Sequence, residues 1–211
     1  MAEMLFSALY ETLYMVFLST LFSALGGLGL AILLILTGPH GLRPNLKLYT
    51  GLDIAVNLLR SFPFMILMIA LIPFTRIIAG VAYGSTAAIV PLTIAAIPFM
   101  ARLIEGSLLE VDPGVIEAAR SFGASDNQII FRVMFKEALP SITLNVAILA
   151  ITLLGYSAMA GAIGGGGLGA LAYNEGYIRF KPDIMFYSVV VLILMVQCIQ
   201  SGGNYLYKKL R

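Results

Sequence analysis

The sequence is poor in charged residues, cysteine and histidine, and each shortage removes a class of function. Only 11% of its 211 residues are charged, against about 25% in an average soluble domain, which excludes a water-soluble globule. Cys198 is the one cysteine, so no disulfide forms within the chain, and with the one histidine, His40, it makes no clustered metal site. The chain also lacks the G-x-x-x-x-G-K-[ST] loop that cradles nucleotide phosphates, and it shows no serine–histidine or paired-carboxylate arrangement at membrane depth. We therefore expect a protein that is not an enzyme and binds no metal or cofactor itself.

Long uncharged runs fill most of the chain instead. A helix needs about 20 apolar residues to cross the bilayer core. The runs therefore predict an all-α integral membrane protein with one domain over residues 1–211. Its five predicted transmembrane helices cover residues 12–37, 53–79, 85–109, 140–163 and 184–206. Four prolines in the second and third spans are expected to kink them: Pro63, Pro73, Pro91 and Pro98.

The lysines and arginines gather at one end of these spans. Ten lie on the side of the first-to-second loop, the third-to-fourth loop and the C-terminus, and three lie on the other side. The positive-inside rule then places the C-terminus in the cytoplasm and the N-terminus outside. The net charge of +2 follows from this topology and gives no reason to propose nucleic acid as a partner. The expected surroundings are membrane lipid.

Arg60 is the one basic residue well inside a predicted span. Its guanidinium either reaches the inner membrane surface along its apolar stem or pairs with an acid. The candidate partners are Asp53, one heptad earlier, and Glu105 and Glu110 near the cytoplasmic end of the third span.

A polar insert at residues 112–138 separates the third and fourth spans and carries the signals of two short helices. Asp112 is a suitable N-cap and Pro113 suits the first helical position. Gly123 can adopt the left-handed conformation that ends a helix. Ser125, with a glutamine three residues later, predicts a capping box that begins a second helix. The prediction is a helix–turn–helix with an abrupt corner at the basic end of the bundle.

The first of these short helices suits a mechanical joint. Ala118 and Ala119 are small enough for the helix to lie close to another backbone in a groove, and Glu117 can accept hydrogen bonds from the groove wall. Gly123 sets the angle between the two helices. The simpler alternative is an amphipathic loop that rests on the membrane surface.

The fourth span ends in a glycine-rich segment. Ser157, Gly161, Gly165 and Gly169 recur every four residues and predict a ridge of small residues for close helix packing. A G-x-G-x-x-G pattern also begins at Gly164, but no strand precedes it, so a dinucleotide site is rejected. Packing alone is one interpretation of the ridge. The other places it near a dimer axis, with Tyr156, Ser157 and Met159 at a translocation path.

These features together resemble a known family. The Glu-Ala-Ala tripeptide followed by Gly123 is similar to the loop by which permease subunits of ABC importers engage their ATPase. Over nearly its whole length the chain resembles the permease subunit of the methionine ABC importer, a type I importer. The resemblance lies in RSFPF at 60–64, IPFTR at 72–76, AIVPLT at 88–93, SLLE at 107–110, EALP at 137–140 and GYSAM at 155–159.

The resemblance implies a permease of the bacterial inner membrane that moves methionine by alternating access. It implies coupling through Glu117, Ala118, Ala119 and Gly123 to two ATPase subunits, which would hold the ATP and magnesium. It also implies a second copy of the chain, an extracytoplasmic methionine-binding lipoprotein, and Met159 at the outer gate. Two alternatives stay open: a permease for another amino acid or small solute, and a channel or carrier outside the ABC class. The substrate that the resemblance implies is L-methionine, with D-methionine as a further candidate.

Overall fold

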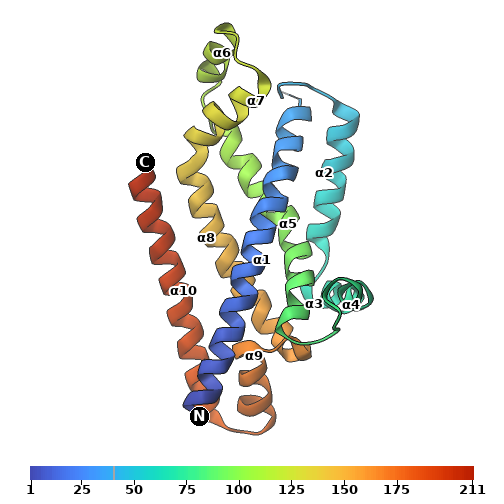
Figure 1. Ribbon diagram of the computed structural model, residues 1–211, viewed down its shortest axis with the longest axis vertical. Helices are drawn as coiled ribbons and strands as arrows, with labels where there is room; N and C mark the ends of the chain where they lie inside the picture. Colours follow the sequence, from blue (N-terminus) through green and yellow to red (C-terminus); the bar gives the residue numbers. More distant parts are fainter. Residues whose placement is uncertain (40) are drawn as a thin grey trace.

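The computed structural model describes residues 1–39 and 41–211 and is built of helices (Figure 1). His40 lies outside the described residues. The α-helices are α1 (Ala2–Thr37), α2 (Leu46–Ser61), α3 (Phe64–Ala70), α4 (Ile72–Ala79), α5 (Ser85–Leu109), α6 (Pro113–Ser121), α7 (Asp126–Gln128), α8 (Phe135–Ala160), α9 (Gly167–Leu171) and α10 (Pro182–Leu210). Three π-helical segments continue them: η1 (Ile129–Met134), η2 (Gly161–Gly165) and η3 (Ala172–Ile178).

Helix α5 is the centre of the bundle. It packs against α1 on one side and α8 on another, and α10 lies outside, against α8 (Figure 1). Many of the fully buried side chains belong to α5 and α8, among them Leu92, Met100, Leu108, Leu149 and Leu153. The apolar faces of three long helices thus meet in one core, while α10 keeps most of its surface free.

Four of the five predicted spans coincide largely with long helices of the structure. Helix α5 begins and ends where the span 85–109 was placed, and the spans 12–37 and 184–206 lie within longer helices. The span 140–163 runs past the end of α8 at Ala160 into η2, where Ile163 has non-helical backbone. Each of these four is long and apolar enough to cross a membrane, and the bent pair of α2 and α3 provides up to one more. The all-α, multi-span architecture therefore agrees with the prediction.

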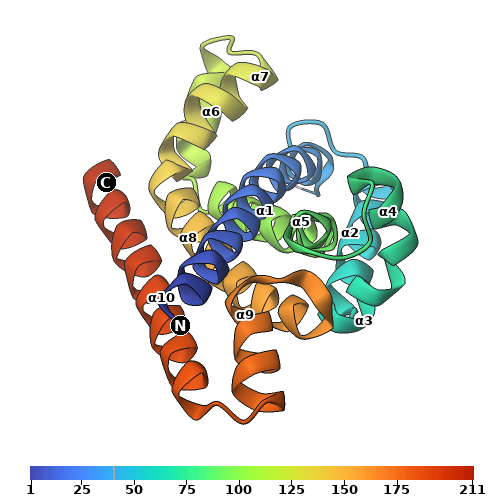
Figure 2. The ribbon, with the colours of Figure 1, turned by 60° about the horizontal axis from the view of Figure 1, so that its bottom comes forward.

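The second predicted span, 53–79, is not one kinked helix. It is divided into α2, α3 and α4, and α3 turns away from α2 by 100°. Phe62 and Pro63 have extended backbone, with ψ of 129° and 127°. A proline ring disfavours helical backbone at the preceding residue and removes an N–H donor, so the helix ends there. Figures 1 and 2 show the result, since α4 lies across the bundle and not along it.

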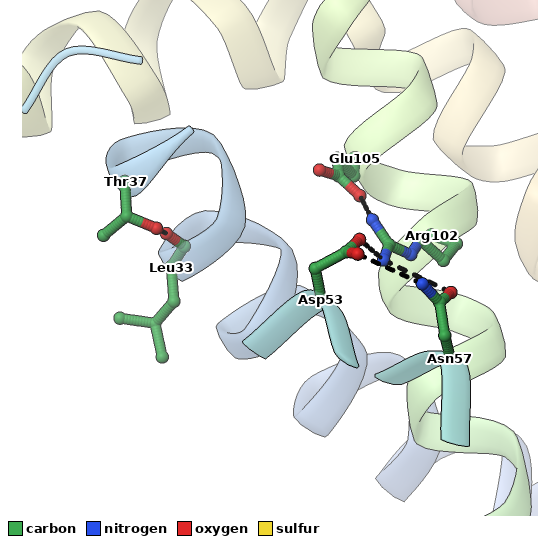
Figure 3. Close-up of polar contacts among 6 residues, drawn as sticks. All are labelled: Leu33, Thr37, Asp53, Asn57, Arg102 and Glu105. Carbon is green, nitrogen blue, oxygen red and sulfur yellow. Dashed lines mark hydrogen bonds and ion pairs between the residues drawn. The ribbon is translucent and has the colours of Figure 1, made fainter. Parts of the chain in front are cut away.

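A polar cluster joins α2 to α5 (Figure 3). Arg102 donates to Asp53 of α2 and to Glu105, 2.7 Å away on its own helix, and Asn57 lies beside them. Arg102 thus binds two of the carboxylates that were considered as partners of Arg60, and the structure shows no pairing of Arg60 with either of them. Arg102 and Glu105 are three residues apart on one helix, a spacing that favours an ion pair and is visible in the sequence.

Candidate functional site

Helix α6 protrudes from the bundle at the end opposite the N-terminus (Figure 1). The carboxylate of Asp112 accepts a hydrogen bond from the amide of Gly114 at 2.7 Å, and Pro113 occupies the first turn, so the predicted start is confirmed. No residue of α6 is buried. An isolated helix of nine residues is marginal in water, so this cap and the contacts at its far end hold it in shape.

Gly123 makes the corner that the sequence predicts. Its φ of +79° lies in the left-handed region. Its amide donates to the carbonyl of Arg120 at 2.9 Å, and the amide of Ala124 donates to the carbonyl of Ala119 at 3.1 Å. This pair of bonds is a Schellman motif with glycine at the position that needs positive φ.

The second arm of the corner is anchored firmly in the bundle. Ser125 and Gln128 form the predicted capping box, with a bond of 2.9 Å from the Ser125 amide to the Gln128 side chain. Ile129 and Ile130, which follow, are 0% and 1% exposed. The chain then continues through η1 into α8 as one apolar helical stretch of 40 residues. A force applied to α6 therefore passes through one short corner into a membrane-spanning helix.

The exposed side of α6 carries an apolar stripe that we did not predict. Val115 is 43% exposed and Phe122 is 91% exposed, and with Ala118 they follow the i, i+3, i+7 spacing of one helix face. Glu117 is exposed beside them, whereas Ala119 packs inward against the core. Phe122 could have been found in the sequence as the one aromatic residue of a polar helix end.

The structure separates Ser157 from the other two residues predicted at a translocation path, Tyr156 and Met159. The ring of Tyr156 stacks on Phe64 of α3, with centroids 4.6 Å apart. Ser157 is 2% exposed and its hydroxyl donates to the carbonyl of Leu154, so it lies inside the protomer. Met159 is 47% exposed and lies three residues after Tyr156, on the face of α8 away from Ser157.

The predicted ridge of small residues does not continue along one helix. Gly164, Gly166 and Gly167 all have positive φ, and the chain reverses there into α9. Gly161 consequently faces Gly169 across a hairpin, and a Cβ on Gly161 would lie 2.3 Å from the amide nitrogen of Ala170. The idea of one continuous ridge is wrong, because left-handed glycine backbone ends the helix before it reaches Gly169.

Side chains of helix α1, which is distant in the sequence, cap this hairpin through direct hydrogen bonds. The carboxylate of Glu11 accepts a hydrogen bond from the amide of Gly167 at 2.7 Å, and the Thr12 hydroxyl accepts one from Leu168 at 2.8 Å. The amide of Gly84 donates to the carbonyl of Gly164 at 2.8 Å. Nothing in the sequence pattern links residues 156 positions apart, so this three-way junction was missed.

A compact loop connects η3 to α10 near the N-terminus (Figure 2). The carboxylate of Glu175 pairs with Lys181 and Arg179, both at 2.6 Å, and the hydrogen bond from Lys181 is the main reason that its pKa lies below the usual range. Between these two cations lies Phe180, with a φ of +52° and 86% exposure. Positive φ is unusual for an aromatic residue, so the ion pairs hold Phe180 outward against its backbone preference.

Substituting Glu175 by glutamine should loosen this loop. A carboxylate whose pKa is lower in the folded protein than in the unfolded chain stabilises the fold at pH values above the usual glutamate pKa of about 4.3. This stabilisation is lost as the pH falls through the lower pKa of the folded protein. We expect hydrogen exchange of residues 175–181 to be faster in Glu175→Gln than in the parent at pH 7, with the difference disappearing in acid. Asp183→Asn, which removes a nearby charge without these ion pairs, should leave the exchange unchanged. Equal rates for all three proteins at pH 7 would contradict the role given to Glu175.

Comparison with known proteins gives consistent matches. Residues 27–201 match the family described as binding-protein-dependent transport system inner membrane component. A probable D-methionine transport system permease protein of Vibrio cholerae is 49% identical over 99% of this chain and 92% of its own length. A methionine import system permease protein of Bacillus subtilis is 44% identical over 95% of this chain and 90% of its own. A solved structure described as an inward-facing conformation of the MetNI methionine ABC transporter matches with a TM-score of 0.98 and 44% identity, covering 100% of this chain and 98% of the other.

Proposed function

This chain belongs to the family of binding-protein-dependent transport system inner membrane components, and we infer that it is the permease subunit of an ATP-driven methionine importer. It is a multi-pass protein of the inner membrane that forms the path for methionine, and a separate subunit hydrolyses ATP. The observation that carries this function is the full-length similarity to methionine permeases in sequence and in fold. The capped, protruding α6 is the part of the structure through which such a subunit is driven.

Helix α6 is the proposed contact with the ATPase. Glu117, Ala118 and Phe122 are exposed on it, and a helix with an apolar stripe beside a carboxylate fits a groove on a partner. Ala119 supports the helix from below, and Gly123 fixes its angle to the bundle. The alternative of a loop resting on lipid fits less well, because α6 protrudes beyond the ends of the long helices (Figure 1).

The assembly around the chain is the next part of the proposal. One permease supplies half of a pathway, so two copies pair and engage two ATPase subunits, which hold ATP and magnesium. An extracytoplasmic methionine-binding lipoprotein docks at the end that carries the N-terminus and the exposed Phe180. The C-terminus and α6 then face the cytoplasm, as the excess of lysine and arginine at that end of the bundle favours. ATP binding drives alternating access because the ATP-bound partner has different affinities for the inward-facing and outward-facing states of the permease.

Within the pathway, Met159 is the proposed gate and Tyr156 lies behind it. Met159 is exposed in the protomer and its flexible thioether can close an apolar constriction. The hydroxyl of Ser157 is bonded to Leu154, so Ser157 serves packing in this conformation. Gly161 and Gly165 keep the end of α8 compact, which positions Met159.

Purification with the ATPase and transport in proteoliposomes test the function together. The parent chain should retain the ATPase and take up labelled methionine only when ATP and the binding lipoprotein are present. Phe122→Arg should weaken the ATPase association about 30-fold, the loss expected for a central aromatic contact. Phe180→Arg is the matched control, because it changes an equally exposed phenylalanine at the other end of the bundle and should keep the ATPase.

Two results would contradict the proposal. Retention of the ATPase by Phe122→Arg would remove α6 as the docking helix. Uptake of another amino acid but not of methionine would replace the substrate.

A further inference from the structure

Arg60 is a cation without a counter-charge in the described part of the chain. It lies in the last turn of α2 and is exposed. No ion pair involves it among residues 1–39 and 41–211, and Asp53 and Glu105, its nearest candidates in the sequence, are bound to Arg102 (Figure 3). An arginine facing the bilayer centre costs at least about 3 kcal/mol, so such a residue faces a water-filled path or a partner.

The depth of Arg60 follows from the contacts of its neighbours. Helices α2 and α5 run in opposite directions (Figure 1), and Asp53 is level with Arg102. Arg60 lies seven residues further along α2, about 10 Å deeper, and so is level with about residue 95 of α5. Helix α5 extends from Ser85 to Leu109, which places Arg60 near the middle of a membrane-spanning helix.

Helix α8 gives the same level independently. Asn145 of α8 donates to the carbonyl of Leu103 at 3.1 Å. Tyr156 lies eleven residues, about 16 Å, further along α8, near the level of residue 92 of α5. There its ring stacks on Phe64, four residues after Arg60. Arg60 and this aromatic pair thus belong to one layer at mid-membrane.

Among residues 1–39 and 41–211, no carboxylate lies at that depth. The chain has eleven acidic residues. Four lie toward the end with the N-terminus, namely Glu3, Glu11, Glu175 and Asp183, and seven toward the end with α6, namely Asp53, Glu105, Glu110, Asp112, Glu117, Asp126 and Glu137. A two-fold axis along the membrane normal repeats each residue at the same depth, so a second copy adds no acid in this layer. The missing counter-charge has to come from outside the permease.

We propose that Arg60 binds the carboxylate of the amino acid as it crosses the membrane. A guanidinium offers paired donors that match a carboxylate in two parallel hydrogen bonds. Helix α2 ends at Phe62 and Pro63 in extended backbone, so the carbonyl groups of its last turn are available to the ammonium group of the same amino acid. The apolar side chain then lies along the layer of Tyr156 and the exposed Met159. This assignment rests on the proposed amino-acid import, and it adds to that function a binding site for the zwitterion on the permease.

Uptake by the reconstituted transporter tests the assignment. Arg60→Gln should reduce methionine uptake about tenfold or more at a fixed concentration, because a hydrogen bond to a charged group is lost, while the ATPase still copurifies. Arg60→Lys, which keeps the charge, should retain an intermediate rate. Arg76→Gln is the matched control, since it removes an exposed arginine from the same group of short helices and should transport normally. Parental uptake by Arg60→Gln would overturn the proposal, whereas absence of methionine uptake in the parent would overturn the proposed function instead.

A labelling experiment identifies the recognised group and does not require the glutamine variant to fold. Cysteine is placed at Gly155, which is exposed with open space around it, in a Cys198→Ala transporter without the binding lipoprotein. Methionine should slow the reaction of this cysteine with a small thiol reagent, and methioninamide, which lacks the carboxylate, should not. Equal protection by both compounds, or by neither, would overturn the assignment.

Discussion

Replacing Gly161 by alanine should destabilise the permease by about 3 kcal/mol or more, the upper range for overpacking a core. The added methyl group would lie 2.3 Å from the amide nitrogen of Ala170 and 2.6 Å from the carbonyl carbon of Gly169. Both are backbone atoms, so no side chain can rotate away. Helix α9 cannot easily retreat either, because Glu11 and Thr12 of α1 hold its first amides. The contact therefore has to be relieved by separating α8 from α9.

Thermal unfolding of the purified protein measures this effect. A loss of 3 kcal/mol corresponds to a fall in the midpoint of about 6 °C or more for a chain of this size. Gly202→Ala is the matched control, because no atom lies within 4 Å of its added methyl group and alanine favours the helix. Its midpoint should stay the same or rise slightly. If Gly161→Ala and Gly202→Ala had equal midpoints, the close approach of α8 and α9 would not limit stability.

The features predicted correctly from the sequence are those set by local chemistry. The spans follow from the lengths of uncharged runs, and α5 has the predicted bounds. The corner after α6 follows from short-range signals: a cap at Asp112, a glycine at 123, and a capping box that begins at Ser125. Each of these signals acts within about one helical turn, so the chain does not need tertiary contacts to express it.

The features that were missed depend on contacts between distant segments. Pro63 predicts a break in the second span. The direction that the chain takes after the break, however, is decided by the helices that pack beside it. The partner of Arg102 depends on the register of α2 against α5, which no spacing within one helix contains. The same holds for Glu11, whose bond to Gly167 joins the first helix to the first turn of α9.

Replacing Gly123 by valine should uncouple ATP hydrolysis from methionine uptake. The φ of +79° at this position is strained for a β-branched residue and costs about 1 to 3 kcal/mol. No atom lies within 4 Å of an added methyl group, so the change acts on the backbone and not through a clash. Relieving the strain breaks the bonds of Gly123 and Ala124 to the end of α6 and releases the angle between α6 and η1. The population of the conformation with the parent angle between α6 and η1 then falls about tenfold or more, since 1.4 kcal/mol is a factor of ten.

Uptake and ATP hydrolysis measured in the same proteoliposomes separate this effect from simple loss of assembly. In Gly123→Val, methionine uptake per ATP hydrolysed should fall about tenfold, while membrane insertion and thermal stability of the bundle stay near those of the parent, because Gly123 is exposed and outside the core. Gly123→Asn should recover much of the uptake, since asparagine tolerates the left-handed region better than other side chains. That recovery identifies the backbone angle as the cause. Full coupling in the valine variant would mean that the corner does not transmit the movement of the ATPase, and coupling would then have to depend on the exposed face of α6 alone.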